Sequence, residues 1–304
     1  MRAKFSKVLC ATDFSATSQR ALVYADLIAR QFNATLLLCH VADLSGAGLY
    51  DMSAQVFTRA REKVLSEAAD EMRALMAGRT TRWEPVVAEG FAAIQIPRLA
   101  EQHQVDLVVA GTHGRSGVSR LLLGSVAERL QKTLDCPFLA VRDGPANIAM
   151  PLADDLRFRR ILVGCDFSTD SSRAIEHALS LAQEFEAEVD LIHVFEPSDY
   201  ARWVGAPAGI ASDLERAVRE TVHAKLAGLV SAEQRTWCDV KTLLAVGKPH
   251  EEIAKHARTA PADLIVLGVR GHSAVEEILV GSTAERVLRA AHCPVLTVKA
   301  SAAT

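Results

Sequence analysis

Two glycine-rich segments have the residue types and spacing of a phosphate-binding loop. One runs from Gly111 to Ser125 and the other from Gly268 to Ser282, and both read Gly-x2-Gly-x9-Gly-Ser. Glycine has no Cβ atom, so a backbone rich in glycine can approach a ligand closely. The pattern favours an anion site. The plainer alternative is that the glycines form tight turns that the fold needs with or without a ligand.

A capping-box pattern follows each loop. The two sequences are Ser125-Val-Ala-Glu128 and Ser282-Thr-Ala-Glu285, in which the serine would cap the first turn of a helix. We therefore expect each loop to end at a helix N-terminus. Unpaired N–H groups and the positive end of the helix dipole meet there and attract phosphate.

An aspartate ends an apolar run near the start of each loop-containing repeat. Asp13 follows Val-Leu-Cys-Ala-Thr, and Asp166 follows Leu-Val-Gly-Cys. Such a carboxylate could accept hydrogen bonds from a ribose or a base. Its charge would disfavour a phosphate placed directly on it.

The whole chain is a repeat of one domain. An offset of 153 residues relates Asp13 to Asp166, and after a four-residue insertion an offset of 157 relates Gly111 to Gly268. A repeat of this length, in preserved order, indicates two copies of a complete domain rather than a solenoid of short units.

We expect one domain at residues 1–142 and a second at 159–304, because the intervening segment 143–158 has no strand or helix periodicity. This segment contains glycine, prolines and charged residues, which is typical of a linker.

Short runs rich in valine, leucine and isoleucine alternate with helical patterns, which predicts an α/β fold with a parallel sheet buried on both faces. In the first repeat the expected strands lie near Lys7–Ala11, Thr35–Val41, Trp83–Val87, Asp106–Ala110 and Pro137–Val141. The expected helices are Ala16–Phe32, Met52–Ala77, Pro97–His103 and Val126–Leu134. The third helix is expected to begin at Pro97, because a proline inside a helix removes a backbone hydrogen bond.

Composition excludes several classes of function. The net charge is −3 and the isoelectric point is near 6.4, and no basic stripe suggests nucleic-acid binding. No apolar run is long enough to span a bilayer. The first residues lack the pattern of a signal peptide, so we expect a cytoplasmic protein. The six cysteines form no CxxC pair, and we expect them to be reduced and structural. His250 and His256 lie six residues apart, which is not the spacing of helical metal ligands, and we expect no metal site.

The loop, the aspartate and the Cys-Pro sequence before the final strand together resemble the universal stress protein family, twice and over nearly the whole chain. The resemblance implies two tandem Rossmann-like domains, each with five strands in the order 3-2-1-4-5. In the ATP-binding branch of the family the loop holds the phosphates and ribose, while the ends of the first two strands hold adenine. The nucleotide-binding residues implied in the first repeat are Thr12, Asp13, Val41, Gly111, His113, Gly114, Gly124, Ser125 and Val126. Those implied in the second are Asp166, Val194, Gly268, Arg270, Gly271, Gly281, Ser282 and Thr283.

The two loops differ in charge. The first carries Arg115 and Arg120, whereas the second carries Glu276 and Glu277, whose carboxylates would oppose a triphosphate if they faced it. Arg270 would add a fixed positive charge inside the second loop. The balance makes the first repeat the stronger expected site.

The leading hypothesis is a stress-response regulator that binds adenine nucleotide, namely ATP with Mg²⁺, possesses no catalytic residues of its own, and hydrolyses ATP slowly if at all. The resemblance also implies pairing of domains through their last strands, within the chain or in a homodimer, and a protein partner whose identity is open. One alternative is a nucleotide-free dimerisation or interaction scaffold. An enzyme that processes adenine nucleotides is a weaker alternative, because no Gly-x4-Gly-Lys-Ser/Thr motif and no nucleophile-base arrangement is legible.

Overall fold

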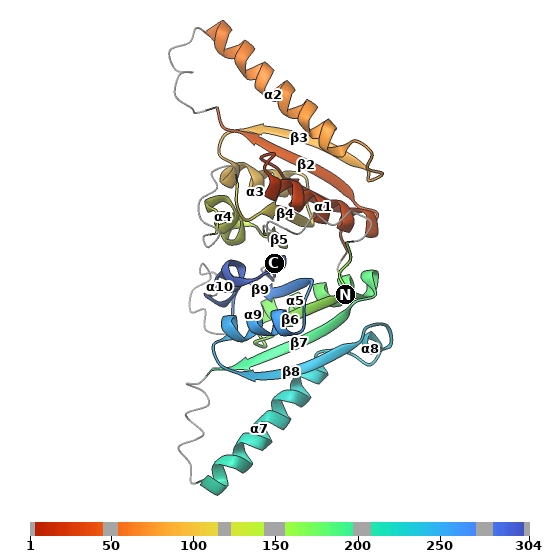
Figure 1. Ribbon diagram of the computed structural model, residues 1–304, viewed down its shortest axis with the longest axis vertical. Coiled ribbons are helices and arrows are strands. Elements are labelled where there is room, and N and C mark those ends of the chain that lie inside the picture. The colour runs from red at the N-terminus through yellow and green to blue at the C-terminus, as the bar shows by residue number, and fades with distance from the viewer. Residues whose placement is uncertain are drawn as a thin grey trace. The chain divides into compact units, whose positions relative to one another are not determined.

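The computed structural model describes residues 4–44, 54–114, 123–142, 156–196, 208–271 and 282–300. The chain divides into two compact units, with the boundary between Leu156 and Arg157, and each unit contains one of the repeats (Figure 1). Both units have an α/β fold. Within each unit, neighbouring strands pair in parallel.

The first unit has the strand order β3-β2-β1-β4-β5, as the resemblance implied. Its elements are β1 (Lys7–Ala11), α1 (Ala16–Gln31), β2 (Thr35–Ala42), α2 (Ala54–Met76), β3 (Trp83–Glu89), α3 (Ala92–Gln102), β4 (Leu107–Gly111), α4 (Ser125–Thr133) and β5 (Phe138–Val141).

The second unit has the equivalent order, β8-β7-β6-β9-β10. Its elements are β6 (Arg160–Gly164), α5 (Thr169–Phe185), β7 (Glu188–Phe195), α7 (Ala208–Gly228), α8 (Gln234–Trp237), β8 (Val240–Val246), α9 (Pro249–Thr259), β9 (Leu264–Gly268), α10 (Ser282–Ala290) and β10 (Val295–Val298). The short helix α8 has no counterpart among the elements expected from the sequence.

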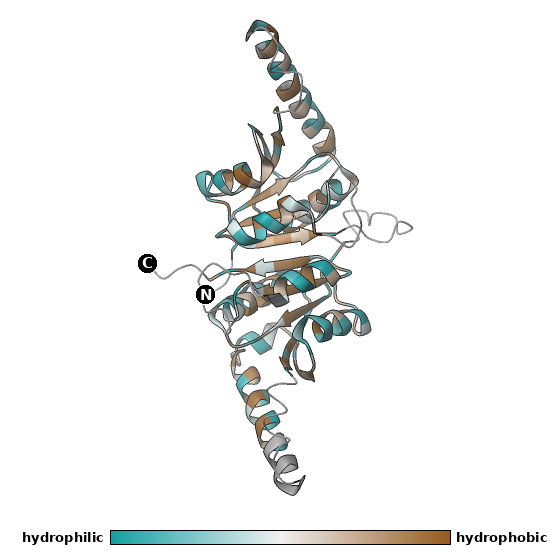
Figure 2. Cartoon of the chain, turned by 90° about the vertical axis from the view of Figure 1, so that its left-hand side faces the viewer, coloured by the Kyte–Doolittle hydropathy of each residue, from teal (hydrophilic) through white to brown (hydrophobic). Residues whose placement is uncertain are grey.

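The central strands are buried on both faces, which explains their continuous apolar runs. Val8, Leu9 and Cys10 of β1 are fully buried, as are Val108 and Val109 of β4. Helices must therefore cover both faces of each sheet. Figure 2 shows the strands mostly in the brown of apolar residues, while the helices carry both colours.

Right-handed crossovers decide which helices share a face. The path from β1 through β2 to β3 moves in one direction across the sheet, and the path from β3 to β4 and β5 moves in the other. Helices α1 and α2 therefore belong to one face and α3 and α4 to the opposite face, where α3 packs against α4. The direction changes between β1 and β4, so these two strands flank the switch point of the sheet.

The expectation that α3 begins at Pro97 is wrong. The helix begins at Ala92 and contains Pro97 in its sixth position, so the proline removes only the one hydrogen bond that its nitrogen would have donated to Ala93. The equivalent helix of the second unit, α9, starts at the corresponding place with Pro249 as its first residue, where a missing N–H has no cost.

An aromatic pair marks the start of each unit. Phe5 packs edge-on against Phe32 with ring centroids 5.0 Å apart, and Phe158 packs against Phe185 at the same distance. Both Phe5 and Phe158 are almost completely buried. Phe158, the last residue of the segment expected to be a linker, is therefore part of the folded second unit. Residues 143–155 of that segment lie outside the described part of the chain.

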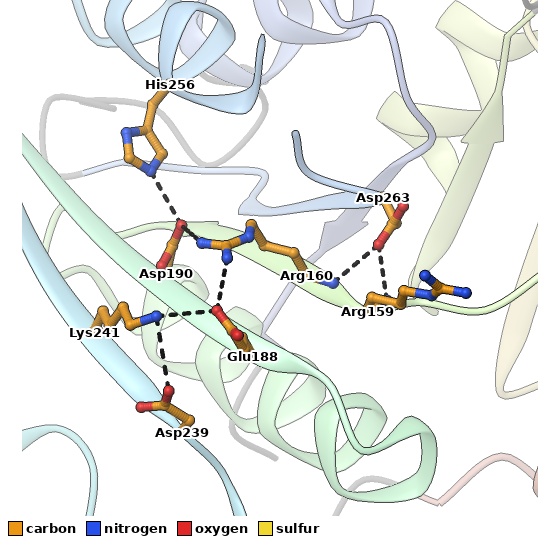
Figure 3. A network of polar contacts seen from close by, with 8 residues as sticks. All are labelled: Arg159, Arg160, Glu188, Asp190, Asp239, Lys241, His256 and Asp263. Carbon is orange, nitrogen blue, oxygen red and sulfur yellow. Dashed lines mark hydrogen bonds and ion pairs between the residues drawn. The ribbon is translucent and has the colours of Figure 1, made fainter. Parts of the chain in front are cut away.

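A charged network occupies the second unit at the start of its sheet (Figure 3). Asp190 on β7 is 2% exposed, and its carboxylate lies 3.1 Å from both Arg160 Nη1 and His256 Nε2. Arg160 continues the network through Nη2 to Glu188, 2.7 Å away, which also pairs with Lys241 at 3.0 Å. Arg160 thus neutralises the buried Asp190 carboxylate, and His256 supplies a second polar contact to it.

Candidate functional site

The glycine loop and the first-strand aspartate of each unit meet at the switch point of the sheet. β1 and β4 are parallel neighbours, with Leu9 opposite Val108, so both strands end at the same edge. Asp13 follows β1 and Gly111 ends β4. This edge, next to the change in strand direction, is where open α/β sheets place ligands.

A tight turn fixes the Asp13 carboxylate. Phe14 adopts a left-handed backbone conformation, with φ of 65°, which turns the chain from β1 into α1. Ser15 then donates to Asp13 Oδ1 from its backbone N–H at 3.1 Å and from its hydroxyl at 2.6 Å. Ser15 is also the N-cap of α1, accepting from the Ser18 N–H at 3.3 Å. The orientation of Asp13 is therefore set by the same residue that starts the helix.

The other Asp13 oxygen faces Gly114. A Cβ atom placed on Gly114 would lie 2.7 Å from Asp13 Oδ2, and one placed on Gly111 would lie 2.9 Å from the methyl group of Thr17. The loop therefore rests directly on the aspartate and on the first turn of α1. Absence of a side chain at these two glycines is what permits that approach.

Gly124, rather than Ser125, is the N-cap of α4, so the predicted capping box is wrong here. Gly124 donates to the Thr112 carbonyl at 2.8 Å and accepts from the Glu128 N–H at 2.9 Å, which anchors the helix start to the end of β4. Ser125 is the first helical residue and is exposed. Its hydroxyl and the N–H groups of the first turn, including that of Val126, therefore lie at the helix end that favours anions.

His40 and Phe14 form the neighbouring wall of the site. His40 Nδ1 hydrogen-bonds with the Thr12 carbonyl at 2.9 Å, and the His40 ring lies over Phe14 with centroids 4.6 Å apart. Neither His40 nor Phe14 is among the site residues implied by the sequence. Val41, the next residue of β2, pairs with Ala88 of β3 and is partly exposed.

His113 follows Thr112 at the end of β4. Its Nδ1 hydrogen-bonds with the Thr112 hydroxyl at 2.9 Å. Its Nε2 is buried and has no hydrogen-bond partner among the described residues. Residues 115–122 of the loop lie outside the described part of the chain, including Arg115 and Arg120.

The second unit repeats the arrangement between aspartate and loop. Phe167 has φ of 64°, Asp166 Oδ1 accepts from the Ser168 N–H at 3.0 Å, and a Cβ on Gly271 would lie 2.6 Å from Asp166 Oδ2. His193 Nδ1 hydrogen-bonds with the carbonyl of Cys165 at 2.8 Å.

Other predicted residues of the second site are only partly described. Val194 pairs with Ala245 at the end of β7, and Thr283 lies in the first turn of α10. Gly281 and the side chain of Ser282 lie outside the described residues, as do Glu276 and Glu277.

Arg270 does not add an uncompensated charge inside the second loop, which corrects that expectation. Its Nε and Nη2 donate to the two oxygens of Asp170 at 3.2 and 3.3 Å, and Nη2 also donates to the Ala300 carbonyl at 3.0 Å. Asp170 lies in the first turn of α5 and is buried. Sequence reasoning overlooked Asp170 because it lies 100 residues from its partner; the signal was its replacement of Thr17 at the equivalent position of the first repeat.

Buried thiols near the sites are held in the protonated form. Burial raises the pKa of the Cys39 thiol to about 12 and also raises that of Cys165, beside Asp166. A protonated thiol is a poor nucleophile and a poor metal ligand. Among the described residues no group of three or more His, Cys, Asp or Glu side chains could hold a metal ion.

Fold and site together define a tandem α/β protein with a glycine loop and an aspartate at each switch point. The model of the universal stress protein family matches residues 4–142 and 157–299. The chain therefore belongs to the universal stress protein family and carries the family's domain twice.

Individual relatives agree with this assignment. A universal stress protein of Methanocaldococcus jannaschii is 37% identical over 143 residues, which cover 47% of this chain and 82% of the relative. The universal stress protein E homolog of Haemophilus influenzae is 25% identical over 320 residues, covering 98% of each chain. The crystal structure of a universal stress protein from Archaeoglobus fulgidus shares the fold, with a TM-score of 0.68, 23% identity, and coverage of 99% of this chain and 98% of that one.

Within the described ranges, no helix combines the length and apolar character that a bilayer span requires.

Proposed function

We propose that this protein binds ATP, with Mg²⁺, at the glycine loop of at least one unit, and acts as a regulatory nucleotide binder. The observation that carries the proposal is that three features meet at the switch point: the glycine loop, the Asp13 carboxylate and the N-terminus of α4. The glycine loop after β4 lies against Asp13, because a Cβ atom placed on Gly114 would be only 2.7 Å from Asp13 Oδ2, and α4 begins directly after the loop's last glycine, Gly124. Such a point favours an anionic ligand with a polar, neutral end.

Each part of the site has a role in this proposal. The backbone of Gly111–Gly114 and the first turn of α4, from Gly124 to Val126, would hold the phosphates through N–H groups. Asp13, oriented by Ser15, would accept hydrogen bonds from ribose or base hydroxyl and amino groups. The ends of β1 and β2, at Thr12 and Val41, would bound the base.

His113 supports the presence of a polar ligand. A buried ring nitrogen with no partner is costly, because it has lost water without gaining a hydrogen bond. The Nε2 of His113 is such an atom within the described residues, and a phosphate or ribose oxygen in the loop would satisfy it. A magnesium ion would arrive with the triphosphate, coordinated largely by phosphate oxygens and water.

The kind of groups at this edge supports a regulatory rather than a catalytic role. A site that needs only binding uses backbone N–H groups and a fixed carboxylate, whereas hydrolysis also needs a positioned base for the attacking water. Backbone N–H groups and a fixed carboxylate alone are compatible with slow ATP hydrolysis.

Isothermal titration of the nucleotide-stripped chain tests the proposal. We expect saturable binding of ATP in the presence of magnesium, weaker binding of GTP, and ATP in the nucleotide released from the protein as isolated. Phosphate release measured on the same sample should be slow. No heat with ATP, together with protein that carries no nucleotide, would reject ATP binding and favour an interaction scaffold.

A further inference from the structure

Arg270 ties the second loop to the N-terminal turn of α5. Besides its guanidinium bonds, Arg270 donates its backbone N–H to Asp170 Oδ2 at 2.9 Å. Its carbonyl accepts from the Ser168 hydroxyl at 3.2 Å. The backbone and the side chain of one loop residue are thus both held by the N-terminal turn of α5.

Asp170 acts as an anion built into the protein. Its two oxygens receive the backbone N–H of Arg270, the Arg270 guanidinium, and the backbone N–H of Ala300 at 2.9 Å. Backbone N–H groups of a loop and an arginine fork are the same donors that hold a bound phosphate. In the second unit a carboxylate that is only 3% exposed already occupies them.

The first unit carries a different pair of residues at the same two places. Thr17 stands where the second unit has Asp170, and His113 stands where it has Arg270. Thr17 is buried with its methyl group against Gly111, and it brings no charge that would compete with a phosphate. Both positions differ between the repeats, as expected if their two side chains act as a pair.

We propose that each chain binds one ATP, in the first unit, and that the Asp170–Arg270 pair is the feature that withholds the second loop from the triphosphate. A triphosphate at the second loop would meet an arginine whose charge is already balanced, and would lie near a buried carboxylate of like charge. This inference rests on the proposed function and specifies where it is carried out.

Exchanging the pair between the units is the direct test. The full-length variant Asp170→Thr/Arg270→His gives the second unit the residues of the first, and calorimetric titration with ATP and magnesium should then show a stoichiometry moving from one toward two. The reciprocal variant Thr17→Asp/His113→Arg should weaken binding by about tenfold or more. A wild-type stoichiometry of two, or a second unit that stays silent in the first variant while folded by circular dichroism, would overturn the inference.

A gentler pair of substitutions locates the site if the exchanges disturb folding. Gly114→Ala and Gly271→Ala are matched, because each places a Cβ within 2.7 or 2.6 Å of the Oδ2 of the unit's own aspartate. Gly114→Ala should reduce ATP affinity about tenfold, whereas Gly271→Ala should leave it unchanged. Equal losses, or a loss only at Gly271, would overturn the assignment to the first unit. Absence of ATP binding by the wild type would reject the proposed function itself, whereas binding at two sites would reject only the inference.

Discussion

Ser15 connects the stability of a helix with the orientation of a ligand-facing carboxylate. Its hydroxyl caps α1 and also donates to Asp13. In the second unit, Ser168 caps α5 in the same way, but its hydroxyl donates to the Arg270 carbonyl instead. Both serines therefore cap a helix, but only Ser15 also orients a carboxylate of the proposed site through its hydroxyl.

Ser15→Ala and Ser168→Ala form a matched pair for this distinction. Each should lower the free energy of unfolding by about 1 kcal/mol, since each removes an N-cap, as measured by urea denaturation. Only Ser15→Ala should also weaken ATP binding, because Asp13 loses the hydroxyl that orients it. An ATP affinity that is untouched by Ser15→Ala would argue against Asp13 as a ligand-contacting residue.

His177 on α5 should make the second unit sensitive to acid. Burial lowers its pKa from 6.5 to about 4, and Arg173 adds to the effect. Between these two values the unfolded chain binds a proton that the folded chain does not, so the free energy of unfolding falls as the pH falls through this window. The loss by pH 4 is at most about 3 kcal/mol.

The variant His177→Tyr tests this linkage, because tyrosine occupies the equivalent position, Tyr24, in the first repeat. Urea denaturation at pH 7 and pH 5 should show a smaller loss of stability in the variant than in the wild type. Parallel losses in both proteins would mean that His177 does not carry the acid sensitivity.

At the scale of elements, the two copies pack the same strand and helix together with different side chains, polar in the second unit and apolar in the first. The pair Asp190 and His256 joins β7 to α9 in the second unit, whereas the first unit has Leu37 and Leu99 at these positions. A buried, hydrogen-bonded polar pair often adds little net stability over apolar residues of similar size, although removing one partner is costly.

This contrast predicts a non-additive result for Asp190 and His256. Asp190→Leu alone should destabilise the protein by about 1–3 kcal/mol, because it removes the partner of both Arg160 and His256. The double variant Asp190→Leu/His256→Leu should recover part of that loss, with the coupling measured by a double-mutant cycle in urea. Strictly additive effects would show that the two residues do not act as a pair.

Local sequence rules predicted the elements well and their ends less well. The strands were predictable because each central strand is a continuous apolar run between two helical layers. The start of α3 was not, because the cost of Pro97 is a single hydrogen bond that the packing of α3 on α4 can offset. The start of α4 also escaped the capping rule, because the bond from Gly124 to Thr112 fixes the helix one residue earlier.

At the scale of the whole molecule, the repeat carried most of the prediction. Two copies of the loop and of the first-strand aspartate indicated the family and the strand order, and the topology then brought Asp13 and Gly114 together from 101 positions apart. The Asp170–Arg270 pair could be identified only from the structure, because no local sequence rule relates residues on different elements. Duplication has left the second loop with an internal ion pair at positions where the first unit has Thr17 and His113, a difference that composition alone does not reveal.

The most direct test of the account is the stoichiometry of ATP binding by the full-length, nucleotide-stripped chain in the presence of magnesium. We predict one ATP per chain, with an affinity that falls about tenfold when Gly114 rather than Gly271 is replaced by alanine. A chain that binds no ATP, in titration or as isolated, would contradict the central claim that the glycine loop of this protein is a nucleotide site.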